Sequence, residues 1–64
     1  MKKVIYAVYS AMPGEGGVPL FEKEADFASL SEAMDYCYFS DLDWYKIEEE
    51  VNERKEVLVE CLLW

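Results

Sequence analysis

The chain has 64 residues, of which 53% are hydrophobic, and its formal net charge is −8 at pH 7. This length allows one domain with a thin core, and the apolar content argues against an intrinsically disordered chain. The surplus of acids repels nucleic acid and anionic membranes, so we expect neither as a direct partner. We therefore expect one folded domain, residues 1–64, whose partners are cationic.

The N-terminal half predicts two strands separated by a loop. Residues 3–11 are rich in β-branched and aromatic side chains, and apolar residues occupy both parities, which is typical of a central strand. Glycines and a proline predict a loop over residues 12–17. Residues 18–25 predict a second strand, in which Pro19 suits the first positions or a sheet edge.

The middle of the chain predicts a helix over residues 30–39. Ser29 and Glu32 have the spacing of a capping box at a helix N-terminus. The residues that recur at helical spacing and form an apolar stripe are Leu30, Ala33, Met34, Cys37 and Tyr38. We expect this stripe to pack on one face of the sheet.

The C-terminal part predicts a second hairpin. Residues 44–51 alternate between apolar and polar side chains, residues 52–55 indicate a turn, and residues 57–63 predict the returning strand. The sequence thus predicts the α+β class in the order β-β-α-β-β, a small mainly antiparallel sheet with one helix on one face. The expected core contains Tyr6 or Ala7, Leu30, Met34, Cys37, Ile47, Val59 and Cys61.

The composition argues against an enzyme, a cofactor and a metal site. Histidine is absent, no serine has a base motif beside it, and a structural zinc site needs four Cys or His ligands. Asp41 and Asp43 suggest calcium, but the glycine of an EF-hand loop is missing, and two aspartates after a helix more often belong to a solvated turn. Cys37 and Cys61 form either a disulfide or, as we expect in a reducing compartment, two buried and unreactive thiols.

The N-terminus predicts no targeting signal. Lys2 and Lys3 have the charge of a signal peptide, but tyrosines, Ser10 and Pro13 interrupt the apolar run that should follow. No stretch reaches the roughly 20 apolar residues that a membrane-spanning helix needs. We expect a cytoplasmic protein.

The net negative charge is concentrated in residues 26–53, which hold nine acids and one base, Lys46. Such a block attracts cationic partners, and carboxylates offer Arg and Lys the same acceptors as phosphates do. Alternatively, the acids serve only solubility and protect a sheet edge. The candidate partner-binding residues, expected on one continuous surface, are Glu32, Asp35, Tyr36, Phe39, Asp41, Asp43, Glu48 and Glu50.

In its size, its acidic block and its run Glu48-Glu49-Glu50, the chain resembles the small acidic inhibitor proteins of phages and other mobile elements. These include anti-CRISPR, anti-restriction and DNA-glycosylase-inhibiting DNA mimics. The resemblance covers under half of the chain and assigns no role to any residue. It implies an inhibitor that occupies the basic surface of a nucleic-acid-handling protein.

A second hypothesis arises from the sheet face away from the predicted helix. Strand alternation places Trp44, Leu58, Leu62 and Trp64 on this face, where they would form an exposed apolar patch. Such a patch indicates a homodimer interface or a partner site, and the protein would then be a structural or assembly protein. Alternatively, one strand has the opposite parity, or the chain ends cover the patch.

Overall fold

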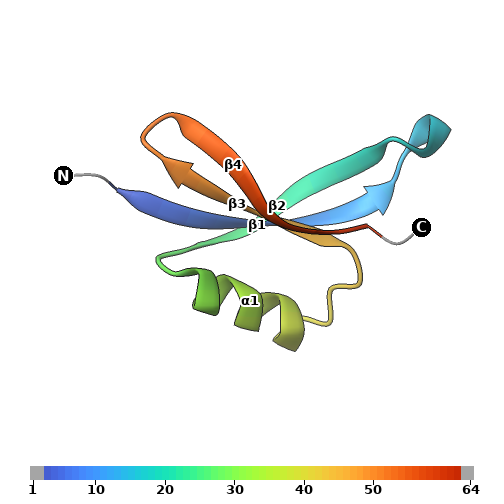
Figure 1. Cartoon of the computed structure of the whole chain (residues 1–64). Coiled ribbons are helices and arrows are strands. Elements are labelled where there is room, and N and C mark those ends of the chain that lie inside the picture. The colour runs from blue at the N-terminus through green and yellow to red at the C-terminus, as the bar shows by residue number, and fades with distance from the viewer. Residues whose placement is uncertain (1–2, 63–64) are drawn as a thin grey trace.

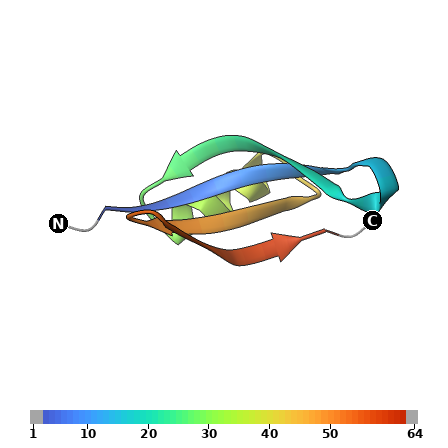
Figure 2. The ribbon, with the colours of Figure 1, turned by 90° about the horizontal axis from the view of Figure 1, so that it is seen from above.

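The structure is a computed structural model that describes residues 3–62. Its neighbouring strands all pair antiparallel, in the order β2-β1-β3-β4, as the view from above shows (Figure 2). The predicted α+β class, an antiparallel sheet with one helix, is therefore confirmed. The elements are β1 (Val4–Pro13), a short 3-10 turn η1 (Glu15–Gly17), β2 (Pro19–Phe27), α1 (Leu30–Phe39), β3 (Tyr45–Val51) and β4 (Arg54–Cys61).

The helix covers one face of the sheet, and the two hairpins bend away from it in opposite directions (Figure 1). The other face, called the open face below, lies between the two bent hairpins. The β1–β2 hairpin extends beyond the start of β3. The last backbone hydrogen bond between β1 and the segment that leads into β3 runs from the Ala11 amide to the Trp44 carbonyl (3.0 Å). The next residue of β1 whose amide would point to the same side is Pro13, and proline has no N–H to donate.

Strand β1 is central, as the apolar residues at both of its parities predict. Val8 faces the helix and packs against Ile47 on β3, whereas Ala7 points to the open face, since successive side chains in a strand alternate. Both side chains have 0% exposure. The open face is therefore covered at its centre, although no helix lies over it.

The helix begins as predicted, but its buried side differs from the predicted stripe. The Ser29 side chain accepts a hydrogen bond from the Glu32 amide (3.2 Å), which confirms the N-cap. Ala33 and Cys37 are buried and belong to the core cluster with Val8 and Ile47. Met34 and Tyr38 were expected on the same side; instead they are 42% and 80% exposed. Among the predicted core residues, Met34 is therefore wrong.

Each outer strand contains a β-bulge. The bulge in β4 places some residues of this strand on the face opposite to the predicted one. Ile47 pairs with Val59, but Glu48 pairs with Val57, so Leu58 is an extra residue on β4. Val57 consequently shares the open face with Glu48 instead of the helix face, and it is 44% exposed. A regular alternation cannot anticipate this shift, because one inserted residue reverses the parity of everything beyond it.

The two cysteines are free, but they differ in burial. Cys37 lies in the core at 4% exposure, and desolvation by burial raises its pKa. Cys61, at the end of β4, is only half-buried, and its Sγ lies 3.7 Å from the Asp43 carbonyl oxygen. The expectation that both thiols are buried is therefore wrong for Cys61.

Candidate functional site

The helix and its flanking loops carry acids without any balancing base. Residues 28–44, called the helix layer below, contain no lysine or arginine. All four of their acids are exposed, and in an exposed position a carboxylate keeps its charge and meets an approaching partner first. The four acids are Glu32, Asp35, Asp41 and Asp43.

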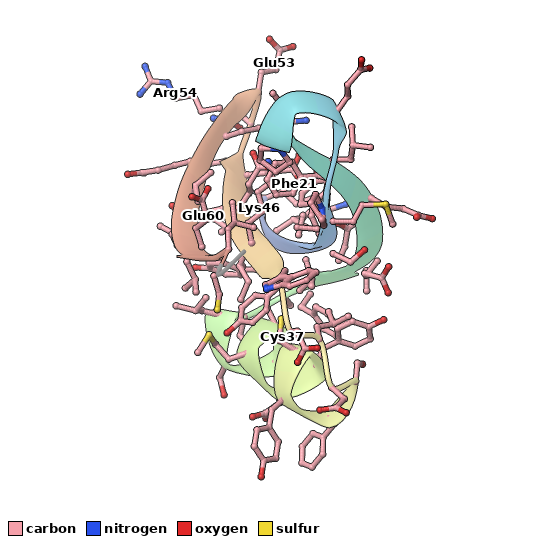
Figure 3. All side chains as sticks on the ribbon, turned by 90° about the vertical axis from the view of Figure 1, so that its right-hand side faces the viewer. Phe21, Cys37, Lys46, Glu53, Arg54 and Glu60 are labelled. Carbon is pink, nitrogen blue, oxygen red and sulfur yellow. The ribbon has the colours of Figure 1, made fainter. Side chains whose placement is uncertain are left out.

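Lys46, the one base of the acidic block, lies on the open face and is largely enclosed. Its ammonium group lies 4.0 Å from the ring centroid of Phe21 and 5.0 Å from that of Tyr9 (Figure 3). The same group pairs with the Glu48 carboxylate at 3.3 Å, and its side chain is only 16% exposed. Lys46 therefore neutralises nothing on the surface of the helix layer.

Glu48 and Glu50 do not join the surface that the helix acids form. They pair in register with Ala7 and Ile5 of β1 and so lie on the open face, on the opposite side of the sheet from the helix. Their carboxylates pair with lysines, Glu48 with Lys46 at 3.3 Å and Glu50 with Lys55 at 3.7 Å, and their side chains are 12% and 20% exposed. The single continuous surface expected from Glu32 to Glu50 is thus divided between two faces.

Tyr36, a predicted binding residue, holds the helix to the sheet. Its ring packs on Phe27 with the centroids 5.3 Å apart, and its hydroxyl donates to Oε1 of Glu24 (3.2 Å). The other oxygen of Glu24 accepts from Ser10 Oγ (3.0 Å). Tyr36 is half-buried by these contacts, so little of its ring is available to a partner.

Phe39 and its neighbour Tyr38 instead provide the exposed aromatic surface. They are 79% and 80% exposed, and their rings form an edge-to-face pair with centroids 5.2 Å apart and planes at 85°. The sequence predicts Tyr38 in the apolar stripe and not at a binding surface, because its spacing of four residues from Met34 fits either side of the helix. The usable signal was the pair of consecutive aromatic residues at the helix end, which cannot both face the sheet.

A hydrogen-bonded cap positions Asp41 at the helix C-terminus. The Asp41 amide donates to the Tyr38 carbonyl and the Leu42 amide to the Cys37 carbonyl, both at 3.3 Å, which is the Schellman pattern. Leu42 then packs against the core. Asp41 itself has φ = 57°, a left-handed conformation that glycine usually adopts in this motif. The helix thus ends on an exposed acid at a position where glycine would make the protein more stable.

A groove, called the helix-end groove below, lies between the end of α1 and β3. Its volume is about 720 Å3; Cys37, Leu42 and Tyr45 form its floor, and Tyr38, Phe39 and Asp41 belong to its rim. Desolvation by burial raises the pKa of both Cys37 and Tyr45. Both groups are therefore neutral near pH 7, and the charge in this groove is that of Asp41.

The residues of the second hypothesis do not occupy regular strand positions. Trp44 precedes β3 and Leu62 follows β4, and both are half-buried. Leu58 is the extra residue of the β4 bulge and is 40% exposed. Trp64 lies outside the described residues.

Neither a metal centre nor a membrane segment is found in the described part of the chain. Within residues 3–62, no group of three cysteine or carboxylate side chains could hold a metal ion. In the same residues, no helix is long and apolar enough to cross a membrane. No protein-family model, curated protein or solved structure matches the chain.

Proposed function

We propose that this chain is a small inhibitor that binds the basic surface of a nucleic-acid-handling protein through its helix layer. The observation that carries the proposal is the separation of charge between the two faces of the sheet. The exposed acids of the helix layer have no base among them, while Lys46 is enclosed on the open face.

Electrostatic attraction would bring such a partner to the helix layer. A surface of one sign raises the association rate for a partner of the opposite sign, and this effect weakens with salt. Tyr38 and Phe39 stand next to the acids of this layer, and their apolar area would slow dissociation once contact is made. The charge would thus raise the association rate, and the aromatic pair would lower the dissociation rate.

The class of partner follows from the chemistry of carboxylates. Proteins that handle nucleic acids present Arg and Lys side chains to phosphates, and carboxylates offer these side chains the same charged oxygen acceptors. The resemblance to acidic inhibitors of mobile elements suggests the same class. Binding there would exclude nucleic acid from the partner's groove.

Competition with DNA tests this proposal. The immobilised chain is exposed to a nuclease-treated cell lysate at low salt, and retained proteins are eluted with duplex DNA in the same buffer. We expect DNA to release nucleic-acid-binding proteins, and purified examples to bind the chain with an affinity that falls steeply with salt. Retention that DNA does not reverse would contradict the proposal.

Two charge-matched variants localise the binding surface. Glu32→Gln/Asp35→Asn/Asp41→Asn removes three charges from the helix layer, and we expect affinity for a purified partner to fall about tenfold or more. The control, Glu15→Gln/Glu22→Gln/Glu53→Gln, removes three exposed charges from the β1–β2 hairpin and the β3–β4 turn. An equal loss in both variants would mean that net charge, and not the helix layer, drives binding.

The competing hypothesis, a homodimer through the open face with charge serving solubility, receives less support. Tyr9 contacts Lys46, and Lys46 pairs with Glu48 on this face, while Trp44 and Leu62 of the predicted apolar patch are half-buried, so a second copy would find little of that patch exposed. Sedimentation of the purified chain separates the two proposals. A dimer that persists in high salt would favour the assembly function.

A further inference from the structure

The helix-end groove has features that the acids alone do not explain. Its floor consists of core side chains, and its rim carries two aromatic residues at 80% and 79% exposure. Two neighbouring aromatic side chains left in solvent are costly, and on a soluble protein they usually mark an interaction site. The groove is open to solvent, and its volume of about 720 Å3 leaves room for a side chain of a partner to enter.

The two rings pack against each other at the end of a well-capped helix. Tyr38 and Phe39 contact each other edge to face, with planes at 85°, and the helix end that carries them is fixed by the backbone bonds at Asp41 and Leu42. A ring face presented by a fixed helix end loses little entropy when another flat group stacks on it. The rim is therefore prepared for a planar partner.

The electrostatic surroundings select a cation. Asp41 lies on the groove rim, and Asp35 precedes Tyr38 by three residues and Phe39 by four, so its carboxylate shares their side of the helix. The helix C-terminus adds the negative end of its dipole, and no basic residue lies in its last turn. A second copy does not fit here helix layer against helix layer, because the two surfaces carry the same sign of charge.

We infer that the helix-end groove binds an arginine side chain of the basic partner, which stacks on Tyr38 or Phe39 while Asp35 or Asp41 accepts its hydrogen bonds. This inference rests on the proposed function and names the group recognised at that site. Arginine fits better than lysine because its guanidinium is planar, stacks on aromatic faces and donates in a fork to a carboxylate. Lysine can place its ammonium over a ring, as Lys46 does over Phe21, but it cannot stack a planar group on the ring and donate in a fork to a carboxylate at the same time.

Two labelled peptides of equal length and charge, one with arginines and one with lysines between glycine and serine spacers, test the inference by fluorescence anisotropy. We expect the arginine peptide to bind more tightly, by about two- to fivefold for each ring that stacks. If the chain binds both peptides equally, the inference of an arginine-binding groove is wrong, but the proposed charge-based function stands. If it binds neither peptide at low salt, the proposed function itself fails.

Aliphatic replacement of the rings separates stacking from general apolar contact. Tyr38→Leu/Phe39→Leu keeps apolar volume but removes both ring faces, so we expect the preference for arginine to fall below about twofold, with a smaller loss of affinity for the lysine peptide than for the arginine peptide. Leu20→Ala, at an exposed position on β2 (56% exposed), is the control and should keep the preference. Phe39→Leu alone provides a second, milder variant, and circular dichroism verifies that each variant is folded. A preference that survives in both folded ring variants would overturn the inference.

Discussion

The Lys46 ammonium group lies 4.0 Å from the ring centroid of Phe21, although their strands, β3 and β2, are separated in the sheet by β1. The Lys46 side chain therefore crosses over β1, above Tyr9, and covers the face that the helix leaves open. A 64-residue chain has few ways to bury both faces of a sheet. Here one face is covered by a helix and the other by a charged side chain held between aromatic rings.

Lys46 should therefore contribute to stability more than an ordinary surface lysine. Lys46→Met keeps the apolar stem but leaves Glu48, at 12% exposure, without its partner, so we expect the free energy of unfolding to fall by about 1–3 kcal/mol. The control is Lys55→Met, because Lys55 is 58% exposed and its pair with Glu50 spans 3.7 Å; we expect at most about 0.5 kcal/mol there. Urea titration measures both, and equal effects would refute the structural role of Lys46.

Two truncations test the orientation of the helix relative to the sheet. Ile47 is fully buried, so Ile47→Ala should reduce the free energy of unfolding by about 2–5 kcal/mol. Met34 is 42% exposed, and Met34→Ala should cost less than about 1 kcal/mol. Thermal or chemical unfolding checks the difference. If Met34→Ala were as damaging as Ile47→Ala, the helix would be rotated toward the stripe that the sequence alone predicts.

Asp41 offers a stabilising substitution. Its φ of 57° suits glycine, and its charge opposes the negative end of the helix dipole, so Asp41→Gly should add about 0.5–1 kcal/mol. For a domain of this size, that corresponds to a rise in Tm of about 2–8 °C. Asn52→Gly is the control, since Asn52 has a similar φ of 58° but carries no charge. A lower Tm for Asp41→Gly would show that the carboxylate makes a stabilising contact.

The pKa values predict a loss of stability in alkaline solution. Desolvation by burial raises the pKa of Cys37 above 9.0 and that of Tyr45 above 10.0, and a hydrogen bond with Glu49 raises the pKa of Tyr6 above 10.0. The folded state therefore holds these protons more tightly than the unfolded state does. Stability is fully present below about pH 9 and is lost as pH rises through the folded-state pKa values.

Cys37→Ala isolates the first part of this alkaline loss. The variant is less stable at every pH because it leaves a small cavity, but without the thiol its stability should start to fall only near the ordinary tyrosine pKa of 10.0. Melting curves recorded between neutral and strongly alkaline pH give the onset. An unchanged onset would assign the whole effect to the tyrosines.

The thiols should differ in their rates of modification. Cys61 is half-buried near the chain's C-terminal end, whereas Cys37 is buried and its pKa is raised, so a thiol reagent should label Cys61 first. Labelling of Cys37 should require opening of the structure and should accelerate in denaturant. Mass spectrometry of digested protein after timed labelling identifies the modified residue. Faster labelling of Cys37 would contradict its burial.

Local patterns were sufficient to predict the elements of this fold. The spacing of Ser29 and Glu32 placed the start of the helix, and apolar residues at both parities of residues 3–11 correctly indicated the central strand. Both are short-range signals, in which the residues that decide the structure are neighbours along the chain. The location of the charge on the helix was also visible in the sequence, because no base occurs between residues 28 and 44.

Features that depend on distant contacts were not predictable in this way. The rotation of the helix depends on Phe27, which pairs with Tyr36 and not with Tyr38. The alternation of β3 places Glu48 on the open face, but its pairing with an enclosed base depends on two residues far along the chain, Tyr9 and Phe21, which lie against its partner Lys46. Neither the Phe27–Tyr36 contact nor the enclosure of Lys46 leaves a periodic trace in the sequence.

The two β-bulges bear on how the chain behaves when many copies are present. They lie at Glu24 on β2 and at Leu58 on β4, the two outer strands of the sheet. A growing fibre needs an outer strand whose backbone donors and acceptors repeat without interruption, and a bulge breaks that repeat. The overhanging part of β1 ends at Pro13, which removes another donor. Each outer edge is thus a poorer template for a foreign strand than an uninterrupted edge would be.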